Sequence, residues 1–371
     1  MAVVFWISVF LIVYPNVLYP ASIILLSSLF KARETANRVP SHGPVAVICA
    51  AHNEEKVIAE KIENFYAQDY PDRELFIGLD ACSDRTADEI RRVTRDKRVK
   101  VFDYPRQGKA RVIESLIREA WQPYLVLTDA NSIFRADAIS RLMDQMDDNG
   151  GVVCGRLILK GPGRESGEAL YWRLETRLKR AESRWGSVMG ANGAIYLIRR
   201  SLFDPLPKNV INDDLVISLR IYQKGFPIVF ADDAIAEEES EGINSVEIKR
   251  HIRDSAGHVY AARSLTSLLN PLKPKRFFFY VSHRILRWLG PVFLLFALFS
   301  NFALIGRPFY ALLAVLQILA YGSALLVHFF GIRWRPAYVL GHFLILNAIM
   351  FIGYIRAFAG LQKPTWEPTP R

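Results

Sequence analysis

The chain contains only three cysteines in 371 residues, at positions 49, 82 and 154. Because the set is odd and scattered, it predicts neither a disulfide framework nor a zinc site and fits a reducing compartment. The sequence also lacks internal repeats, low-complexity tracts and a convincing cleavage site for a signal peptide. Although the net charge is +10, no nucleic-acid motif accompanies it. Basic residues instead cluster beside apolar runs, so we expect a membrane partner and no nucleic acid.

What is abundant is apolar sequence: hydrophobic residues make up 51% of the chain and charged residues 23%. This mixture predicts a water-exposed domain joined to membrane spans. Residues 2–30 are apolar throughout and are long enough to cross about 30 Å of hydrocarbon. We therefore predict an uncleaved N-terminal transmembrane anchor over residues 1–32. The basic flank, Lys31 and Arg33, places the following domain in the cytoplasm.

The C-terminal third has the pattern of a membrane-associated region. Two basic and aromatic stretches within residues 241–288 predict amphipathic helices at the membrane surface. Residues 289–371 then predict about three spans and a tail, with the spans at 289–305, 309–330 and 337–360. The loop at 306–308 is expected outside and the basic loop near Arg333 in the cytoplasm. The sequence leaves the side of the tail open.

Residues 44–240 alternate short apolar runs with charged amphipathic segments. This alternation predicts an α/β domain with a parallel sheet and helices on both faces. Central parallel strands are buried on both sides, which explains their continuous apolar runs. The expected strands are VAVICAA, LFIGLD, VKVFDY, YLVLTDA and VVCGRLIL, and the expected helices are EEKVIAEKIENFYAQ, DRTADEIRRVTR and GKARVIESLIREA.

Acidic residues mark the ends of these elements. Asp80 and Asp129 close two of the apolar runs, so each should lie at the C-terminal tip of a strand, where open α/β sheets bind ligands. Asp213 and Asp214 open an amphipathic helix further along the chain. Carboxylates gathered at one edge suit a divalent cation, a diphosphate and a general base.

Seven short motifs follow one another along the chain in this order: AAHNEE, LDACSDRT, QGKARV, LTDANS, GANGAIYLIRR, INDDLV and a later Arg-x-x-Arg. Over roughly residues 45–290 this order resembles the membrane-bound family 2 glycosyltransferases, the inverting enzymes that include cellulose, chitin and hyaluronan synthases. The resemblance implies a GT-A (Rossmann-like) cytoplasmic domain with an N-terminal anchor and C-terminal amphipathic and transmembrane helices. It also implies an integral protein of a bacterial inner (plasma) membrane.

The resemblance implies a nucleotide-sugar site and a divalent metal, Mg²⁺ or Mn²⁺. Asp129 and Asn131 stand where the family has its Asp-x-Asp metal motif, and Asn131 replaces the second carboxylate by a neutral amide. Ala50 and His52 replace the family's Pro and Tyr, and Asp254 replaces a Trp. The residues expected to bind the donor are Asn53, Glu54, Asp80, Lys109, Asp129, Arg250 and Arg253.

The resemblance also implies an acceptor site and a catalytic base. The acceptor is expected at Gly190, Asn192 and Gly193, where small residues allow a sugar ring to approach the backbone. Asp214 maps to the base that deprotonates the acceptor hydroxyl, and the neighbouring Asp213 should raise the pKa of Asp214. Structural roles compete with these assignments. Asn53 could cap a helix, and Asp213 and Asp214 could simply stabilise the N-terminus of a helix through its dipole.

The sequence therefore predicts transfer of a sugar from a nucleotide-diphosphate sugar, most plausibly a UDP-sugar, to a saccharide or lipid-linked acceptor with inversion. The product would be an exopolysaccharide or a glycolipid. The alternative is a catalytically silent scaffold of the same fold, or a subunit of a polysaccharide synthase complex. Membrane lipid and a second copy or a partner subunit complete the expected partners. The sugar, linkage, acceptor and processivity stay open.

Overall fold

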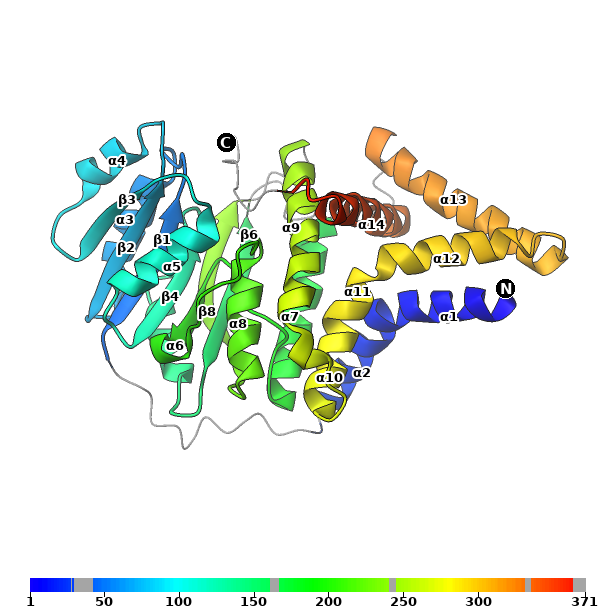
Figure 1. Ribbon diagram of the computed structural model, residues 1–371, viewed down its shortest axis with the longest axis horizontal. Helices are drawn as coiled ribbons and strands as arrows, with labels where there is room; N and C mark the ends of the chain where they lie inside the picture. The colour runs from blue at the N-terminus through cyan, green and yellow to red at the C-terminus, as the bar shows by residue number, and fades with distance from the viewer. Residues whose placement is uncertain (28, 30–42, 161–166, 240–244, 331–334, 363–371) are drawn as a thin grey trace.

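The computed structural model describes residues 1–27, 29, 43–160, 167–239, 245–330 and 335–362. A β-sheet covered by helices occupies one end of the molecule, and long apolar helices occupy the other (Figure 1). The helices α7 (Gly167–Trp185) and α9 (Ser245–Ser264) lie between these two parts in the view. The basic flank at Lys31, the loop near Arg333 and most of the C-terminal tail lie outside the described residues.

The sheet has eight strands in the order β3-β2-β1-β4-β7-β6-β8-β5. Strands β1 to β4 are mutually parallel, as expected, but β7 runs antiparallel to both β4 and β6, and β5 runs antiparallel to β8. The prediction of a purely parallel sheet is therefore wrong for this half, and the sheet is mixed. The bounds are β1 Val45–Ala51, β2 Arg73–Asp80, β3 Val99–Tyr104, β4 Tyr124–Asp129, β5 Ile133–Phe134, β6 Val152–Lys160, β7 Tyr196–Arg199 and β8 Ile228–Glu239.

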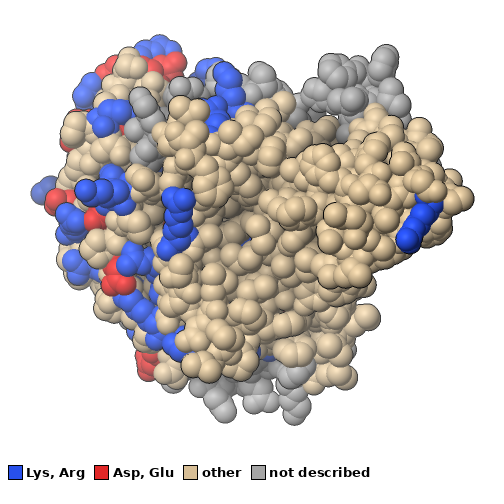
Figure 2. Space-filling model, turned by 45° about the vertical axis from the view of Figure 1, so that its right-hand side comes forward, with Lys and Arg blue, Asp and Glu red and all other residues tan. Residues whose placement is uncertain are grey.

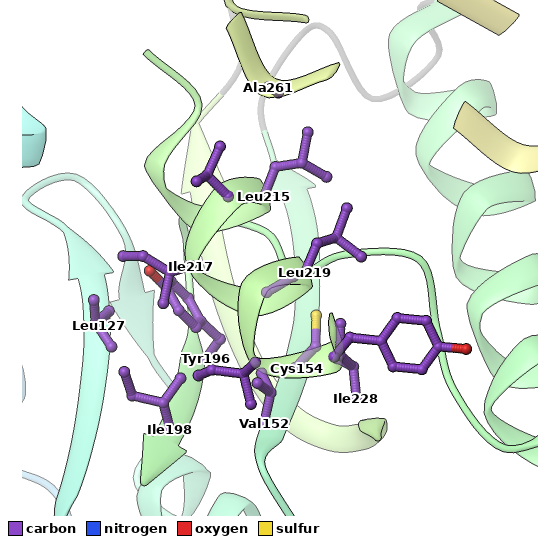
Figure 3. Packing of buried hydrophobic residues seen from close by; sticks show 14 of the residues in the cluster. Leu127, Val152, Cys154, Tyr196, Ile198, Leu215, Ile217, Leu219, Ile228 and Ala261 are labelled. Carbon is purple, nitrogen blue, oxygen red and sulfur yellow. The ribbon is translucent and has the colours of Figure 1, made fainter. Parts of the chain in front are cut away.

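Helices cover both faces of the sheet, which confirms that part of the prediction. Alternate residues of β1 point to opposite faces: Ile48 packs in the core under α5 and α8, and Val47 packs in the core under α3 and α6. Figure 3 shows side chains of α8, including Ile217 and Leu219, packed over the strands that carry Leu127 and Tyr196. The helices are α3 Ile58–Tyr66, α4 Thr86–Val93, α5 Lys109–Glu119, α6 Ala138–Gln145 and α8 Asp213–Gln223.

The N-terminal anchor is helical from Ala2 to Ser27, with a π-helical turn at Tyr14–Leu18 that contains Pro15. The turn separates α1 (Ala2–Val13) from α2 (Tyr19–Ser27), which point in different directions in Figure 1. Proline lacks an amide hydrogen and its ring crowds the preceding turn, which explains the change of direction.

The C-terminal helices differ from the three predicted spans. Among the described residues two helices are long and apolar enough to cross a membrane, Ala2–Ser27 and Tyr338–Phe358, or three if a bent pair counts as one span. That pair joins Pro274–Trp288 to Gly290–Phe302 at a bend of 60°. The expected span at 289–305 coincides with the second helix of this bent pair, which has 13 residues and is too short to cross a membrane alone.

These helices expose a wide apolar surface. Figure 2 shows a face with few charged groups over the end of the molecule that carries them. Exposing such a face to water costs free energy, so this face is a candidate contact surface for membrane lipid or for another protein. The C-terminal helices are α10 Pro274–Tyr280, α11 Leu286–Trp288, α12 Gly290–Phe302, α13 Pro308–Phe330 and α14 Arg335–Phe358. The exposed apolar side chains include Trp6 and Phe10 of α1, Phe296 and Phe299 of α12, and Leu312 and Leu319 of α13.

The second basic stretch, expected at the membrane surface, is partly built into the protein. His283 is fully buried in a π-helical turn (Val281–Ile285) between α10 and α11, and its two ring nitrogens contact Glu182 at 2.6 Å and Glu175 at 3.1 Å. Tyr19 of α2 donates a hydrogen bond to the same Glu182. These contacts fix the N-terminal anchor, α7 and the C-terminal helices to one another.

Candidate active site

The candidate site lies where β1, β2 and β4 end and where α5 and α8 begin. Lys109, the first residue of α5, links the two acidic motifs: its Nζ lies 2.7 Å from Oδ1 of Asp129 and 3.3 Å from Oδ1 of Asp213. Lys109, Asp129 and Asp213, three predicted site residues from distant parts of the sequence, therefore meet at one point. Asp214 follows in the first turn of α8, where its Oδ1 accepts from the backbone N–H of Leu215 at 2.8 Å.

Burial and mutual charge shift the pKa values of this group. Burial, followed by repulsion from Asp213, raises the pKa of Asp214 to about 6, although Lys109 opposes the change. Burial also raises the pKa of Asp213 against the same lysine. Burial alone would lower the pKa of Lys109, but attraction to Asp129, Asp213 and Asp214 outweighs it and raises that pKa. The site thus holds an ammonium ion beside a carboxylate whose pKa suits a general base near neutral pH.

The loops after β1 and β2 are tied together. Oδ1 of Asn53 accepts from the backbone N–H of Ser83 at 2.8 Å, and its amide donates to the Ser83 hydroxyl at 3.2 Å. The backbone N–H of Glu54 donates to Oγ1 of Thr86 at 2.8 Å. Asn53 does not cap α3, which begins at Ile58. The two loops form one unit at the sheet edge where a nucleotide is expected.

Asp80 is fully buried, and protein groups engage both of its carboxylate oxygens. Oδ1 accepts from the backbone N–H of Gln107 at 2.7 Å, and Oδ2 accepts from Arg106 at 2.5 Å and from the N–H of Gly108 at 3.1 Å. The carboxylate therefore fixes the loop that leads into Lys109. In this conformation Asp80 positions the loop and presents no surface to a nucleotide base.

Asp129 and Asn131 flank Ala130 in the turn after β4, and both are partly exposed. Among the described residues no group of three or more His, Cys, Asp or Glu side chains could hold a metal ion. One carboxylate and one amide oxygen suit Mg²⁺ or Mn²⁺ when a diphosphate supplies further oxygens. Gly193 approaches this turn closely, since an added Cβ would lie 3.0 Å from Oδ2 of Asp129. These residues therefore fit a divalent ion shared with a diphosphate.

The small-residue loop expected to hold the acceptor lies between this turn and α8. Asn192 is buried, and its amide donates to the carbonyl of Gly155 at 2.9 Å, so it shapes the loop from within. The backbone N–H of Ala191 donates to the Ser218 hydroxyl at 3.0 Å. Arg284 donates to the carbonyl of Met189 at 2.6 Å, directly before Gly190. The loop is thus fixed to β6, to α8 and to the π-helical turn that contains Arg284.

Arg250 and Arg253, both on α9, do not share one environment. Arg250 pairs with Glu247 at 2.8 Å and lines a cavity that also contains Asp214. Arg253 pairs with Asp254 at 3.2 Å and does not line that cavity. The spacing placed them on one helix, but the structure brings only Arg250 towards the predicted base.

Lys61 is a site residue that the sequence analysis missed. Its side chain is 2% exposed and donates to Oγ1 of Thr128 at 2.8 Å and to the carbonyl of Ser132 at 2.6 Å. Thr128 in turn donates to the carbonyl of Ala194 at 2.8 Å. Lys61 therefore supports both the metal turn and the acceptor loop. The sequence signal that could have identified Lys61 is its position on the apolar stripe of α3, three residues after Ile58.

A mixed sheet with this order, bearing an aspartate turn, a lysine and an acidic helix start at one edge, has the GT-A glycosyltransferase fold. Residues 42–257 match the family model described as glycosyltransferase like family 2, and the chain belongs to this family.

Relatives and solved structures agree with this assignment. Poly-beta-1,6-N-acetyl-D-glucosamine synthases of Staphylococcus epidermidis and Staphylococcus aureus (strain COL) are 22% and 24% identical over 200 and 195 residues. These matches cover 52% and 50% of this chain and 48% and 47% of the synthases, so the chain spans about half the length of these relatives. The mannosyltransferase PcManGT of Pyrobaculum calidifontis, solved with GDP-Man and Mn²⁺, has a TM-score of 0.72 at 20% identity and covers 96% of this chain and 99% of its own.

Proposed function

We propose that this protein is a membrane glycosyltransferase that moves a sugar from a nucleotide-diphosphate sugar to an acceptor hydroxyl with inversion. The observation that carries the proposal is the bridge that Lys109 forms between Asp129 and Asp213, directly beside Asp214. This cluster combines an oxygen donor for a cation, a positive charge for a diphosphate and a base. The similarity of the chain to polysaccharide synthases and to a mannosyltransferase supports this class of reaction.

In the proposed step Asp214 accepts the proton of the acceptor hydroxyl, and the hydroxyl oxygen forms a bond to the anomeric carbon. The bond from that carbon to the diphosphate oxygen breaks, and its electron pair leaves with the nucleoside diphosphate. Inversion follows because attack and departure occur on opposite faces of the sugar. Lys109 stabilises the negative charge that develops on the diphosphate, and the low dielectric of the half-buried site strengthens this effect.

Asp129 and Asn131 would hold the divalent ion, which when bound neutralises charge on the diphosphate. The chain's own contribution is to orient that turn, through Lys61 and through the close approach of Gly193. The Asn53–Glu54 loop, joined to Ser83 and Thr86, would hold the nucleotide. Uridine and guanosine are both candidates, because the motif order favours the first and the mannosyltransferase of similar fold was solved with GDP-Man.

The decisive experiment is Asp214→Asn in full-length protein in nanodiscs with Mn²⁺ and radiolabelled UDP- and GDP-sugars. We expect transfer to fall by about 10³-fold or more while nucleotide affinity stays within about twofold, because a base acts only in the transition state. The control is Asp233→Asn, an exposed carboxylate outside the site. Loss of nucleotide affinity in Asp214→Asn would contradict the assignment of the base.

Product size separates the remaining alternatives. Polymer retained at the origin of a chromatogram would establish a processive synthase, and one lipid-extractable species would establish single transfer. No turnover with any donor, despite measurable nucleotide binding, would favour the silent scaffold or a missing partner subunit. We propose a bacterial inner-membrane location with the sugar-transfer domain in the cytoplasm.

A further inference from the structure

A cavity of about 400 Å³ connects the predicted base to the membrane helices. Its floor includes Asn192 and Asp214, and its opposite wall is formed by α14 with Phe343, Leu346 and Met350. The volume lies within the range of small-molecule pockets, so it suits one head group better than an extended polysaccharide. Helices α9 and α14 pack against each other beside it.

The polar half of the cavity is cationic. Arg250, Arg284 and Arg287 line it, from α9 and from the segment that contains the π-helical turn and α11. Carboxylates also line it, and the guanidinium groups have protein partners, among them Glu247 for Arg250 and Glu175 for Arg287. Guanidinium groups that converge on a pocket suit a phosphate, because their N–H groups match its oxygens.

Three buried polar atoms of residues that line this cavity have no hydrogen-bond partner in the described part of the chain: Nδ1 of His258, Oδ1 of Asn212 and Oδ1 of Asn347. Unpaired buried polar atoms cost free energy, although two of these face glycines: Oδ1 of Asn212 lies beside Gly257 and Oδ1 of Asn347 beside Gly290. Both asparagine oxygens are acceptors, and burial lowers the pKa of His258 to about 4, which leaves its ring neutral. A head group that combines hydroxyl groups with negative charge would suit this polar lining.

The other half of the cavity is apolar and faces the candidate span Tyr338–Phe358. A lipid chain that lies along Leu346 and Met350 would contact apolar side chains of α14. Free sugars and nucleotides offer nothing to this wall. A lipid matches both halves at once.

We infer that this cavity binds the head group of an acceptor lipid, a phosphate-bearing glycolipid whose sugar hydroxyl faces Asp214 and whose chain lies along α14. The inference rests on the proposed function and names its acceptor class. Arg250, which the sequence analysis placed on the donor, then contacts the acceptor phosphate.

The test measures binding of three probes to the full chain in nanodiscs without any donor. Glucosyl phosphoryl farnesol carries sugar, phosphate and lipid chain, farnesyl glucoside lacks the phosphate, and glucose 1-phosphate lacks the chain. We expect the complete probe to bind at least tenfold more tightly than either partial probe. Equal binding of glucose 1-phosphate would show a free-anion site, equal binding of farnesyl glucoside would show a merely apolar groove, and no binding would overturn the inference.

Two variant pairs locate the site. Arg250→Gln should weaken the complete probe about fivefold and leave farnesyl glucoside unchanged, whereas Arg253→Gln, on the same helix outside the cavity, should change neither. Met350→Trp should weaken both lipid probes by narrowing the apolar half, and Phe351→Trp, its exposed neighbour, should not. Equal effects within each pair would contradict the location. Because no donor is present, failure here is distinguishable from failure of sugar transfer, which Asp214→Asn tests separately.

Discussion

At the scale of single residues, Lys109 has the strongest influence on the site. It is the counter-charge to three carboxylates, and it lowers the pKa values of two of them, Asp213 and Asp214, against the effect of burial. Sequence analysis assigned Lys109 only to the diphosphate. The structure adds that the same ammonium stabilises the ionised form of Asp214, the proposed base, so the proposed donor binding and proton transfer would both depend on this side chain.

Replacing Lys109 by Met should lower kcat/KM about 100-fold or more, because a positive charge at the developing leaving group is lost. The pKa of Asp214 should also rise above about 6, since Lys109 is the group that lowers it. Initial rates against pH measure both effects. Lys109→Arg should restore part of the rate, and Lys97→Met, on the surface, should have none of these effects. An unshifted pH profile in Lys109→Met would contradict the coupling.

The pH dependence of wild-type turnover should follow from the neighbouring carboxylates Asp213 and Asp214. Asp214 must be ionised to accept a proton, and its pKa is raised to about 6 by burial and by Asp213. We therefore expect kcat to be nearly constant above about pH 7 and to fall about tenfold per unit below pH 6. Asp213→Asn removes the repelling charge and should move this acidic limb to lower pH. A limb that moves upward in Asp213→Asn would argue that another group titrates.

At the scale of elements, two close helix contacts connect the membrane to the base. At Gly353 of α14 an added Cβ would lie 2.6 Å from the carbonyl of Ile252 on α9. At Gly257 of α9 an added Cβ would lie 1.7 Å from Oδ1 of Asn212, immediately before Asp213. Figure 3 shows Leu215 of α8 pointing towards Ala261 of α9. The position of the base therefore depends on how α9 packs.

Gly257→Ala should displace Asn212 and with it the start of α8. We expect kcat to fall about 10-fold to 100-fold, because small displacements of a reacting group are costly, and stability to fall by about 1–3 kcal/mol through overpacking. Nucleotide affinity should not change, because the donor loops lie elsewhere. Turnover, binding and thermal unfolding measure the three quantities. Gly322→Ala on α13, with nothing within 4 Å, is the matched control. Equal turnover in both variants would contradict the link.

At the scale of the whole molecule, the apolar face and the sugar-transfer domain define an orientation. The turn between α12 and α13 lies at the end remote from the sheet in Figure 1, and the proposed topology places it outside the cell. Arg307 adjoins this turn, and an added side chain at Gly306 would meet nothing within 4 Å.

Gly306→Cys should react with a membrane-impermeant maleimide in intact cells, because the topology exposes this turn to the outside. Lys97→Cys, on the sugar-transfer domain, should react only after permeabilisation. Wild-type protein gives the background from Cys82, which is half-buried, while the other two cysteines are buried. Labelling in the reverse pattern would invert the proposed orientation.

The sequence by itself determined the elements that local pattern controls. Continuous apolar runs predicted β1, β2, β4 and β6, because strands buried on both faces require them, and alternating apolar residues predicted the edge strand β3. Amphipathic spacing predicted α3, α4, α5 and the start of α8 at Asp213. The order of the seven motifs was enough to indicate the family, and the structure brings Asp129 and Asp213 together around Lys109 beside Asp214.

Only the tertiary structure decided what depends on partners distant in the chain. The antiparallel direction of β7 follows from its pairing with β4 and β6, and the acidic end of β8 is strand only because β6 pairs with it. The burial of Asp80 under Arg106 and the support from Lys61 are contacts between residues distant in the chain, and the packing around α9 decides that Arg250 lines the cavity while Arg253 does not. A sequence pattern reports the preference of a segment for helix, strand or burial, whereas side-chain partners are chosen by packing.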